Sequence, residues 1–156
     1  MAAPRKKQAN PKRPKPGRGR SGGRPAKATG SGALAAKPAG SAGAAILAKV
    51  RRTCLLLPDS TEKIAWGAPT FRVRERLFVM FLDNHHGDGR LAIWVNAPPG
   101  AQDAFVASDP ECYFIPPYVG PSGWLGVRLD RKLRWSEVVR RIEAAHQATL
   151  DKRRAR

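Results

Sequence analysis

The chain has 156 residues with a formal net charge of +17, and 42% of its residues are hydrophobic. This length suits one domain with its own core. No apolar run approaches the roughly 20 residues that a membrane-spanning helix needs, and no secretory-type apolar segment follows the basic start. We therefore expect a soluble, cytoplasmic protein without a membrane partner.

The positive charge is concentrated at the start of the chain. Residues 1–40 hold 11 of the 29 Lys and Arg and none of the 12 acidic residues. They are rich in Pro and Gly, and Leu34 is their only large aliphatic residue after Met1. Such a segment buries too little apolar surface to offset the entropy lost on ordering. We predict a disordered basic tail over residues 1–43.

Acid-free runs of cations attract polyanions and gain free energy by releasing condensed counterions, and nucleic acid is the partner that we expect. A location at the nucleoid would fit this prediction. Two alternatives stay open, a merely solubilising extension and an organellar transit peptide, although Pro and Gly disfavour the amphipathic helix of the latter. The tail cations expected to contact phosphate are Arg5, Lys6, Lys7, Lys12, Arg13, Lys15, Arg18, Arg20 and Arg24.

The ordered domain is predicted over residues 44–150 and opens with an amphipathic helix. Between Ile46 and Leu57, apolar residues recur at three- and four-residue spacing while the basic residues face away. Pro58 ends this helix, and residues 59–62 form the turn into a first short strand. The two cysteines lie far apart in the sequence, so buried thiols are expected, without a disulfide or a zinc site.

Residues 64–82 are predicted to form the centre of a sheet. Phe71 and Val73 alternate with arginines, which is the period-two pattern of a half-buried strand. Residues 77–82 are apolar on both faces, as in a central strand. Between the two strands, Glu75-Arg76 leaves room only for a tight hairpin turn.

The remaining elements predict an α+β fold, in which an antiparallel sheet is backed by N- and C-terminal helices. The closing helix has an inner stripe of Val138, Ile142, Ala145 and Thr149, and residues 151–156 follow it as a basic C-terminal extension. After the hairpin, we expect a polar loop at residues 83–89, a strand at 91–95 and a short helix at 101–107. An irregular connection at 113–122 and a last strand at 124–129 then lead to the closing helix at 135–150.

Several rare Trp, Pro and Gly residues come in a specific order along the chain. They are Leu57-Pro58, Glu62-Lys63, Trp66-Gly67-Ala68-Pro69-Thr70-Phe71, Asp109-Pro110, Phe114, Tyr118-Val119-Gly120, Gly123-Trp124 and Trp135. This order resembles that of the MmcQ/YjbR family over roughly residues 44–150. The resemblance implies a CyaY- or frataxin-like fold and a DNA-binding role through wing-like elements. Family members commonly carry a glycine before the central strand, where this chain has Glu75-Arg76.

The sequence indicates a protein that is not an enzyme and holds no cofactor. Asp83, His85, His86 and Asp88 are metal-capable, but adjacent histidines on an irregular loop seldom face one ion, so a solvated loop is the better interpretation. His146 borders the inner stripe of the last helix, where a packed histidine is commoner than a catalytic base. No Ser/His/Asp or Cys/His arrangement has local support. The basic first helix does not fit the iron-delivery role of frataxin-like proteins.

The aromatic residues have two interpretations. Trp66, Trp94, Trp124 and Trp135 could stack on unpaired bases, but their places in strands or at a helix start favour core packing. Tyr118 and Trp124 flank a glycine-containing segment, and they could be partly exposed. A small cleft is therefore expected, lined by Trp66, Pro69, Tyr118 and Trp124.

We expect a DNA-binding protein that contacts mainly the phosphate backbone, with weak sequence preference because no side chain stands out as a reader of base edges. An RNA- or ribosome-associated binder, and a protein- or small-ligand-binding module with an incidental tail, remain open. The folded-domain residues predicted to contact phosphate could also be ordinary solvent-facing charges. They are Arg72, Arg74, Arg76, Arg128, Arg131, Lys132 and Arg134.

Overall fold

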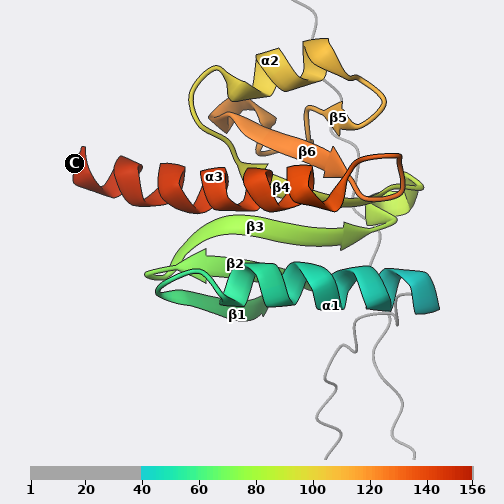
Figure 1. Ribbon diagram of the computed structural model, residues 1–156, viewed down its shortest axis with the longest axis horizontal. Coiled ribbons are helices and arrows are strands. Elements are labelled where there is room, and N and C mark those ends of the chain that lie inside the picture. The colour runs from blue at the N-terminus through green and yellow to red at the C-terminus, as the bar shows by residue number, and fades with distance from the viewer. Residues whose placement is uncertain (1–39, 156) are drawn as a thin grey trace, which may run out of the picture. The chain divides into compact units, whose positions relative to one another are not determined.

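A computed structural model describes residues 40–155 of the chain (Figure 1). Residues 1–39 and 156 lie outside this range, and with them the predicted disorder of the tail and the nine tail cations assigned to phosphate contact. The elements are α1 (Ser41–Leu55), β1 (Ser60–Ala65), β2 (Ala68–Val73), β3 (Arg76–Asp83), η1 (His85–Gly87), β4 (Leu91–Asn96), α2 (Ala101–Ser108), β5 (Tyr113–Phe114), η2 (Gly120–Ser122), β6 (Trp124–Arg128) and α3 (Trp135–Arg154).

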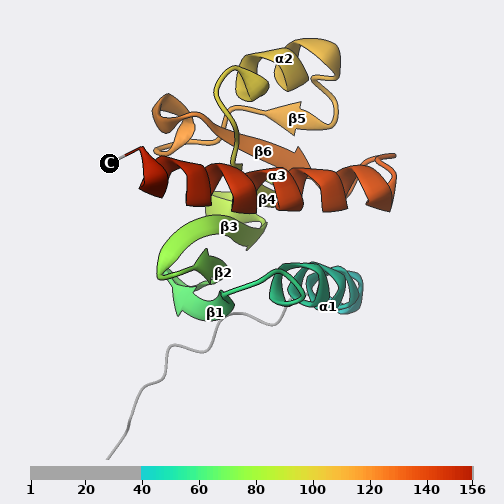
Figure 2. The same cartoon turned by 60° about the vertical axis from the view of Figure 1, so that its left-hand side comes forward.

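The strands form one antiparallel sheet, and the two terminal helices cover the same face of it (Figures 1 and 2). The strand order is β1-β2-β3-β4-β6-β5. Alternate strand residues such as Phe71, Ile93 and Leu125 point toward the helices and pack with Val50 and Ile142 in the main core. The α+β prediction is confirmed.

Two tight hairpins build the first half of the sheet. Each has a two-residue turn, Trp66-Gly67 between β1 and β2 and Arg74-Glu75 between β2 and β3. All four turn residues have positive φ, between 48° and 72°, as the type I′ turns that match strand twist require. The predicted hairpin is confirmed, but its turn lies one residue earlier than expected, since Arg76 already belongs to β3.

Several boundaries differ from the sequence-based expectation. Residues 60–62 belong to β1 and are not a turn, because a polar edge strand lacks the apolar alternation that marks a strand in the sequence. The first helix starts at Ser41, three residues before Ala44. A two-residue strand, β5, lies within the connection that we expected to be irregular. The last helix continues to Arg154, because nothing in Asp151–Arg154 breaks a helix.

The closing helix packs as its pattern predicts. Val138, Ile142, Ala145 and Thr149 are all buried. His146 is buried beside them, with Nε2 at 2.8 Å from the carbonyl oxygen of Pro58 and its ring edge-on to Phe78. This histidine therefore ties the closing helix to the α1–β1 connection.

Both cysteines are free, buried thiols, as predicted, and burial raises the pKa of Cys54 and of Cys112. Among residues 40–155, none of the helices is long and apolar enough to cross a membrane.

Candidate nucleic-acid interface

The folded-domain cations predicted to contact phosphate fall into two groups. Those of the β2–β3 hairpin lie at one end of the sheet, which we call the hairpin end. Those at the end of β6 and in the β6–α3 connection lie at the other, which we call the loop end. The hairpin end carries Arg72, Arg74 and Arg76, and the loop end carries Arg128, Arg131, Lys132 and Arg134.

The strand register separates these two groups. Arg128 pairs with Ala92, which pairs in turn with Leu82 near the end of β3. Arg76 is the first residue of β3, six positions before Leu82, which corresponds to roughly 20 Å at the usual rise per strand residue. The structure therefore does not join the two groups into one patch.

Cations at the hairpin end have partners within the protein. The Arg74 Nε donates to Asp59 Oδ2 at 2.7 Å, and Lys63 pairs with Glu75, which lowers the pKa of that carboxyl group. Arg72 is half-buried and donates weakly to the Glu75 carbonyl oxygen at 3.3 Å. Within residues 40–155, Arg76 is the one cation of this group that is exposed and makes no ion pair or hydrogen bond through its side chain.

The loop end is paired only in part. The Arg128 guanidinium donates two hydrogen bonds to the Asp130 carboxylate, at 2.9 and 2.8 Å. This pairing raises the pKa of Arg128 and lowers the pKa of Asp130. Arg131 lies 3.9 Å from both Asp130 and Glu111. By contrast, Lys132 and Arg134 are exposed, and no carboxylate in the described part of the chain lies within ion-pair distance of either.

The two unpaired cations project because their neighbours are anchored. Leu129 and Leu133 pack against the main core, as does Trp135 at the start of α3. The side chains between these anchors, including Lys132 and Arg134, are left on the outside.

The first helix adds another cation at this end. The Lys49 Nζ lies 4.3 Å from the centre of the Trp135 ring, a cation–π contact, and it has no carboxylate partner within residues 40–155. Lys49 was not among the predicted site residues. Its contact joins two helices that are far apart in the sequence, and no local pattern marks it.

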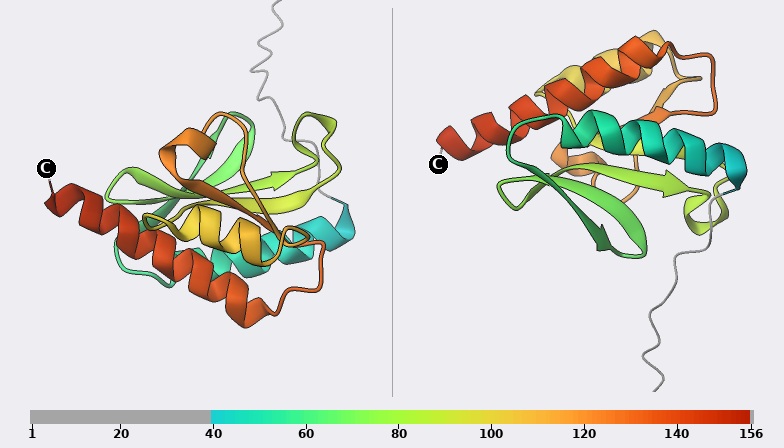
Figure 3. Two further views of the ribbon diagram at one scale, coloured as in Figure 1. Left: turned by 90° about the horizontal axis from the view of Figure 1, so that it is seen from above. Right: turned by 60° about the horizontal axis from the view of Figure 1, so that its bottom comes forward.

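The N-terminal end of α1 lies at the loop end of the sheet (Figures 1 and 3). Ile46, near the start of this helix, lines a cavity together with Leu133 of the β6–α3 connection and Trp135. Ser41, the first residue of α1, therefore lies at the loop end, and residues 1–40, which precede it in the sequence, hold 11 cations and no acidic residue.

The profile of the YjbR family matches residues 55–148. The chain belongs to the YjbR family. The match begins at the last residue of α1, covers the whole sheet and ends within α3, and it confirms the resemblance noted from the sequence. Residues 1–54, which include the basic segment and Lys49, lie outside it. No curated protein sequence matches the chain.

This YjbR domain does not bring the four residues of the expected cleft together. Trp66 sits in the β1–β2 turn with 76% of its surface exposed, so the prediction that it packs in the core is wrong. Pro69 is near that turn on β2. Trp124 is buried at the start of β6, and strands β3 and β4 lie between β6 and β2 in the sheet. Tyr118 is 78% exposed and its ring lies near His86.

Core packing is confirmed for the tryptophans inside strands. Trp94 and Trp124 are 3% and 8% exposed, and they form a second cluster on the sheet face opposite the helices. Met80 and Leu82 of the central strand pack with them. Trp66 differs from these two because it lies in the β1–β2 turn and not within a strand of the sheet.

The polar loop of the YjbR domain places its two histidines side by side. The ring centres of His85 and His86 are 4.0 Å apart, and His85 also packs edge-on against Trp94. Partial burial lowers the pKa of His85. In the part of the chain that the structure describes, no group of three or more His, Cys, Asp or Glu is placed to hold a metal ion.

Proposed function

We propose that this YjbR-family protein binds nucleic acid through phosphate contacts, preferring DNA to RNA, and that it catalyses no reaction. One observation carries the proposal. The unpaired cations of the loop end, Lys132 and Arg134, lie at the same end of the domain as the start of α1, which continues an acid-free segment of 11 cations. One polyanion can therefore contact both.

The chemistry of these groups suits the phosphate backbone. Exposed Lys and Arg side chains neutralise phosphates and release counterions without a preformed pocket. At the loop end, the Arg128 guanidinium is occupied by two hydrogen bonds to Asp130, so its planar fork is not free to read a base edge. Weak sequence preference follows.

The test is a salt series of duplex DNA binding by the full chain, between about 50 and 200 mM salt. The observed affinity should fall with a log-log slope of about −0.9 per phosphate neutralised. A variant in which the nine tail cations from Arg5 to Arg24 are replaced by Gln should bind at least about tenfold more weakly and show a shallower slope.

Two comparisons control this experiment. An RNA duplex of the same sequence, offered as a competitor, should displace the protein less well than unlabelled DNA does. If RNA competes better, the preference for DNA is wrong and the RNA-binding alternative replaces it. Absence of binding to either duplex at the lowest salt would contradict the proposal as a whole.

A further inference from the structure

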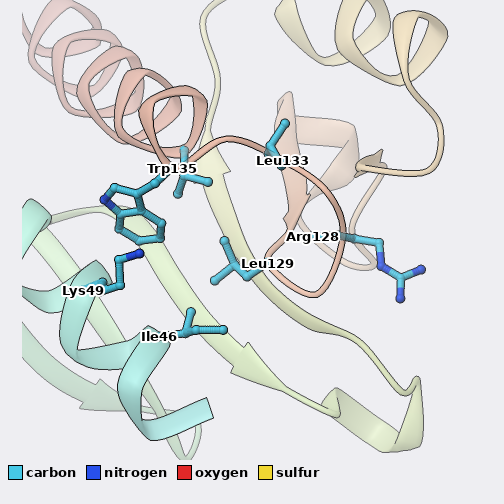
Figure 4. A pocket seen from close by; sticks show the side chains of 7 residues that line it. Ile46, Lys49, Arg128, Leu129, Leu133 and Trp135 are labelled. Atoms are coloured by element: carbon cyan, nitrogen blue, oxygen red, sulfur yellow. The ribbon is translucent and has the colours of Figure 1, made fainter. Parts of the chain in front are cut away.

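A cavity of about 250 Å³ opens between α1 and the start of α3 at the loop end (Figure 4). Three segments far apart in the sequence supply its walls: α1, the end of β6 with the connection that follows, and the first turn of α3. The lining residues are Ile46, Lys49, Arg128, Leu129, Leu133, Trp135 and Val138.

Five of the seven lining residues of this cavity have apolar side chains, and polar atoms supply about half of its exposed lining. Ile46, Leu129 and Leu133 are only partly buried by the core, so each keeps some surface for a ligand. The Arg128 guanidinium points away from the other lining side chains (Figure 4), and Asp130 holds it there. Among the described residues that line the cavity, the charged group left free to meet a ligand is the Lys49 ammonium, next to the Trp135 ring.

The charge around the cavity has one sign. No acidic residue is among its lining residues. Lys49 has no carboxylate partner in the described range, and Leu133 stands between the unpaired Lys132 and Arg134. An anionic group would be attracted to the rim, and the apolar part of a ligand could bury the surface that Ile46, Leu129 and Leu133 leave exposed.

We infer that this cavity binds a small organic acid. An apolar body occupies the space between Ile46, Leu129 and Leu133, and its carboxylate meets the Lys49 ammonium at the rim. The volume lies just below the roughly 300 to 1,000 Å³ of cavities for drug-sized ligands, so a single ring with a short side chain is the size that fits. The inference does not depend on nucleic-acid binding, because the tail cations take no part in it.

The test uses the full chain and a matched pair of ligands, phenylacetate and its neutral amide, phenylacetamide. Binding is followed by NMR through the indole N–H signal of Trp135, which Trp135→Phe identifies. Phenylacetate should shift this signal saturably and bind about three- to fivefold more tightly than the amide, as expected for one partly exposed ion pair.

Two variants with the same change of charge locate the carboxylate. Lys49→Gln should remove the preference for the acid over the amide. Arg52→Gln, on the same helix but outside the cavity lining, should keep it. Inorganic pyrophosphate, an anion without an apolar body, should fail to displace phenylacetate.

Four results would overturn the inference. The first two are equal affinity for acid and amide in the unaltered chain, and an equal loss of the preference for the acid in Lys49→Gln and Arg52→Gln. The other two are full displacement of phenylacetate by pyrophosphate, and a Trp135 signal that does not shift saturably.

Discussion

The two ends of the sheet carry similar numbers of basic residues but use them differently. At the hairpin end, Arg74 is paired with Asp59 and Lys63 with Glu75. At the loop end, Lys132 and Arg134 have no carboxylate partner among residues 40–155. The number of arginines in a segment therefore does not measure the charge that is available to a ligand. The fold decides which cations are neutralised.

The hairpin end should matter for stability and not for DNA binding. The largest expected effect on stability comes from His146, which contacts Pro58, the residue before the Asp59 that pairs with Arg74. His146→Ala removes a buried ring and its contact with the Pro58 carbonyl oxygen, which should lower the free energy of unfolding by about 2–4 kcal/mol. Urea denaturation measures this change, and Glu143→Ala, an exposed position on the same helix, is the control. The DNA affinity of the folded variant should be unchanged. A tenfold loss of affinity would contradict the assignment of stability to the hairpin end and of DNA binding to the loop end.

Removing one acidic residue at each end compares the ends directly. Asp130→Asn weakens the hold on Arg128 at the loop end, whereas Asp59→Asn frees Arg74 at the hairpin end. Each raises the net charge by one. We expect Asp130→Asn to strengthen DNA binding about two- to fivefold, and Asp59→Asn to have a smaller effect. An equal or larger gain from Asp59→Asn in an electrophoretic or fluorescence titration would place the interface at the hairpin.

The β2–β3 turn tests whether geometry outweighs charge at the hairpin end. Glu75 has a φ of 67°, which disfavours residues that carry a Cβ, and its ion pair with Lys63 is exposed. Glu75→Gly should therefore raise the free energy of unfolding by about 0.5–1 kcal/mol despite the lost pair. Glu75→Ala removes the same charge but keeps the Cβ, so denaturation should show no such gain. Equal behaviour of the two variants would mean that the turn is not strained.

The smallest expected effect concerns pH at the loop end. Burial lowers the pKa of His85 below its ordinary value of 6.5, so the unfolded chain holds more protons than the folded one near that pH. The contribution of His85 to stability is therefore present above pH 6.5 and decreases as the pH falls. Denaturation curves at about pH 8 and pH 5.5 should show this decrease, and His85→Gln should reduce it. If the stability of His85→Gln depends on pH as that of the unaltered chain does, His85 is not the origin of the decrease.

Local patterns in the sequence predicted most of the fold. The spacing of Val138, Ile142 and Ala145 marks the buried face of α3, and the alternation around Phe71 marks β2. Residues 60–65 gave no such signal, because β1 is a polar edge strand whose Glu62 is held by Arg51 of α1.

The candidate site was less predictable. The sequence pointed to the basic residues but not to their partners, since Arg74 meets Asp59 and Lys49 meets Trp135 only after the chain folds. Turn geometry was also hidden. Nothing in the sequence indicates that Trp66 and Arg74, which are not glycines, adopt positive φ values.

We propose that the loop end is the part of the folded domain that contacts phosphate. The most direct test of this claim is the salt dependence of duplex DNA binding by two full-length double variants that each lose two positive charges. Lys132→Gln with Arg134→Gln alters the loop end, and Arg74→Gln with Arg76→Gln alters the hairpin end. We predict that the loop-end variant has a log-log slope shallower by about 1.8, while the hairpin-end variant keeps the slope of the unaltered chain. A slope that changes in the hairpin-end variant and not in the loop-end variant would contradict the claim.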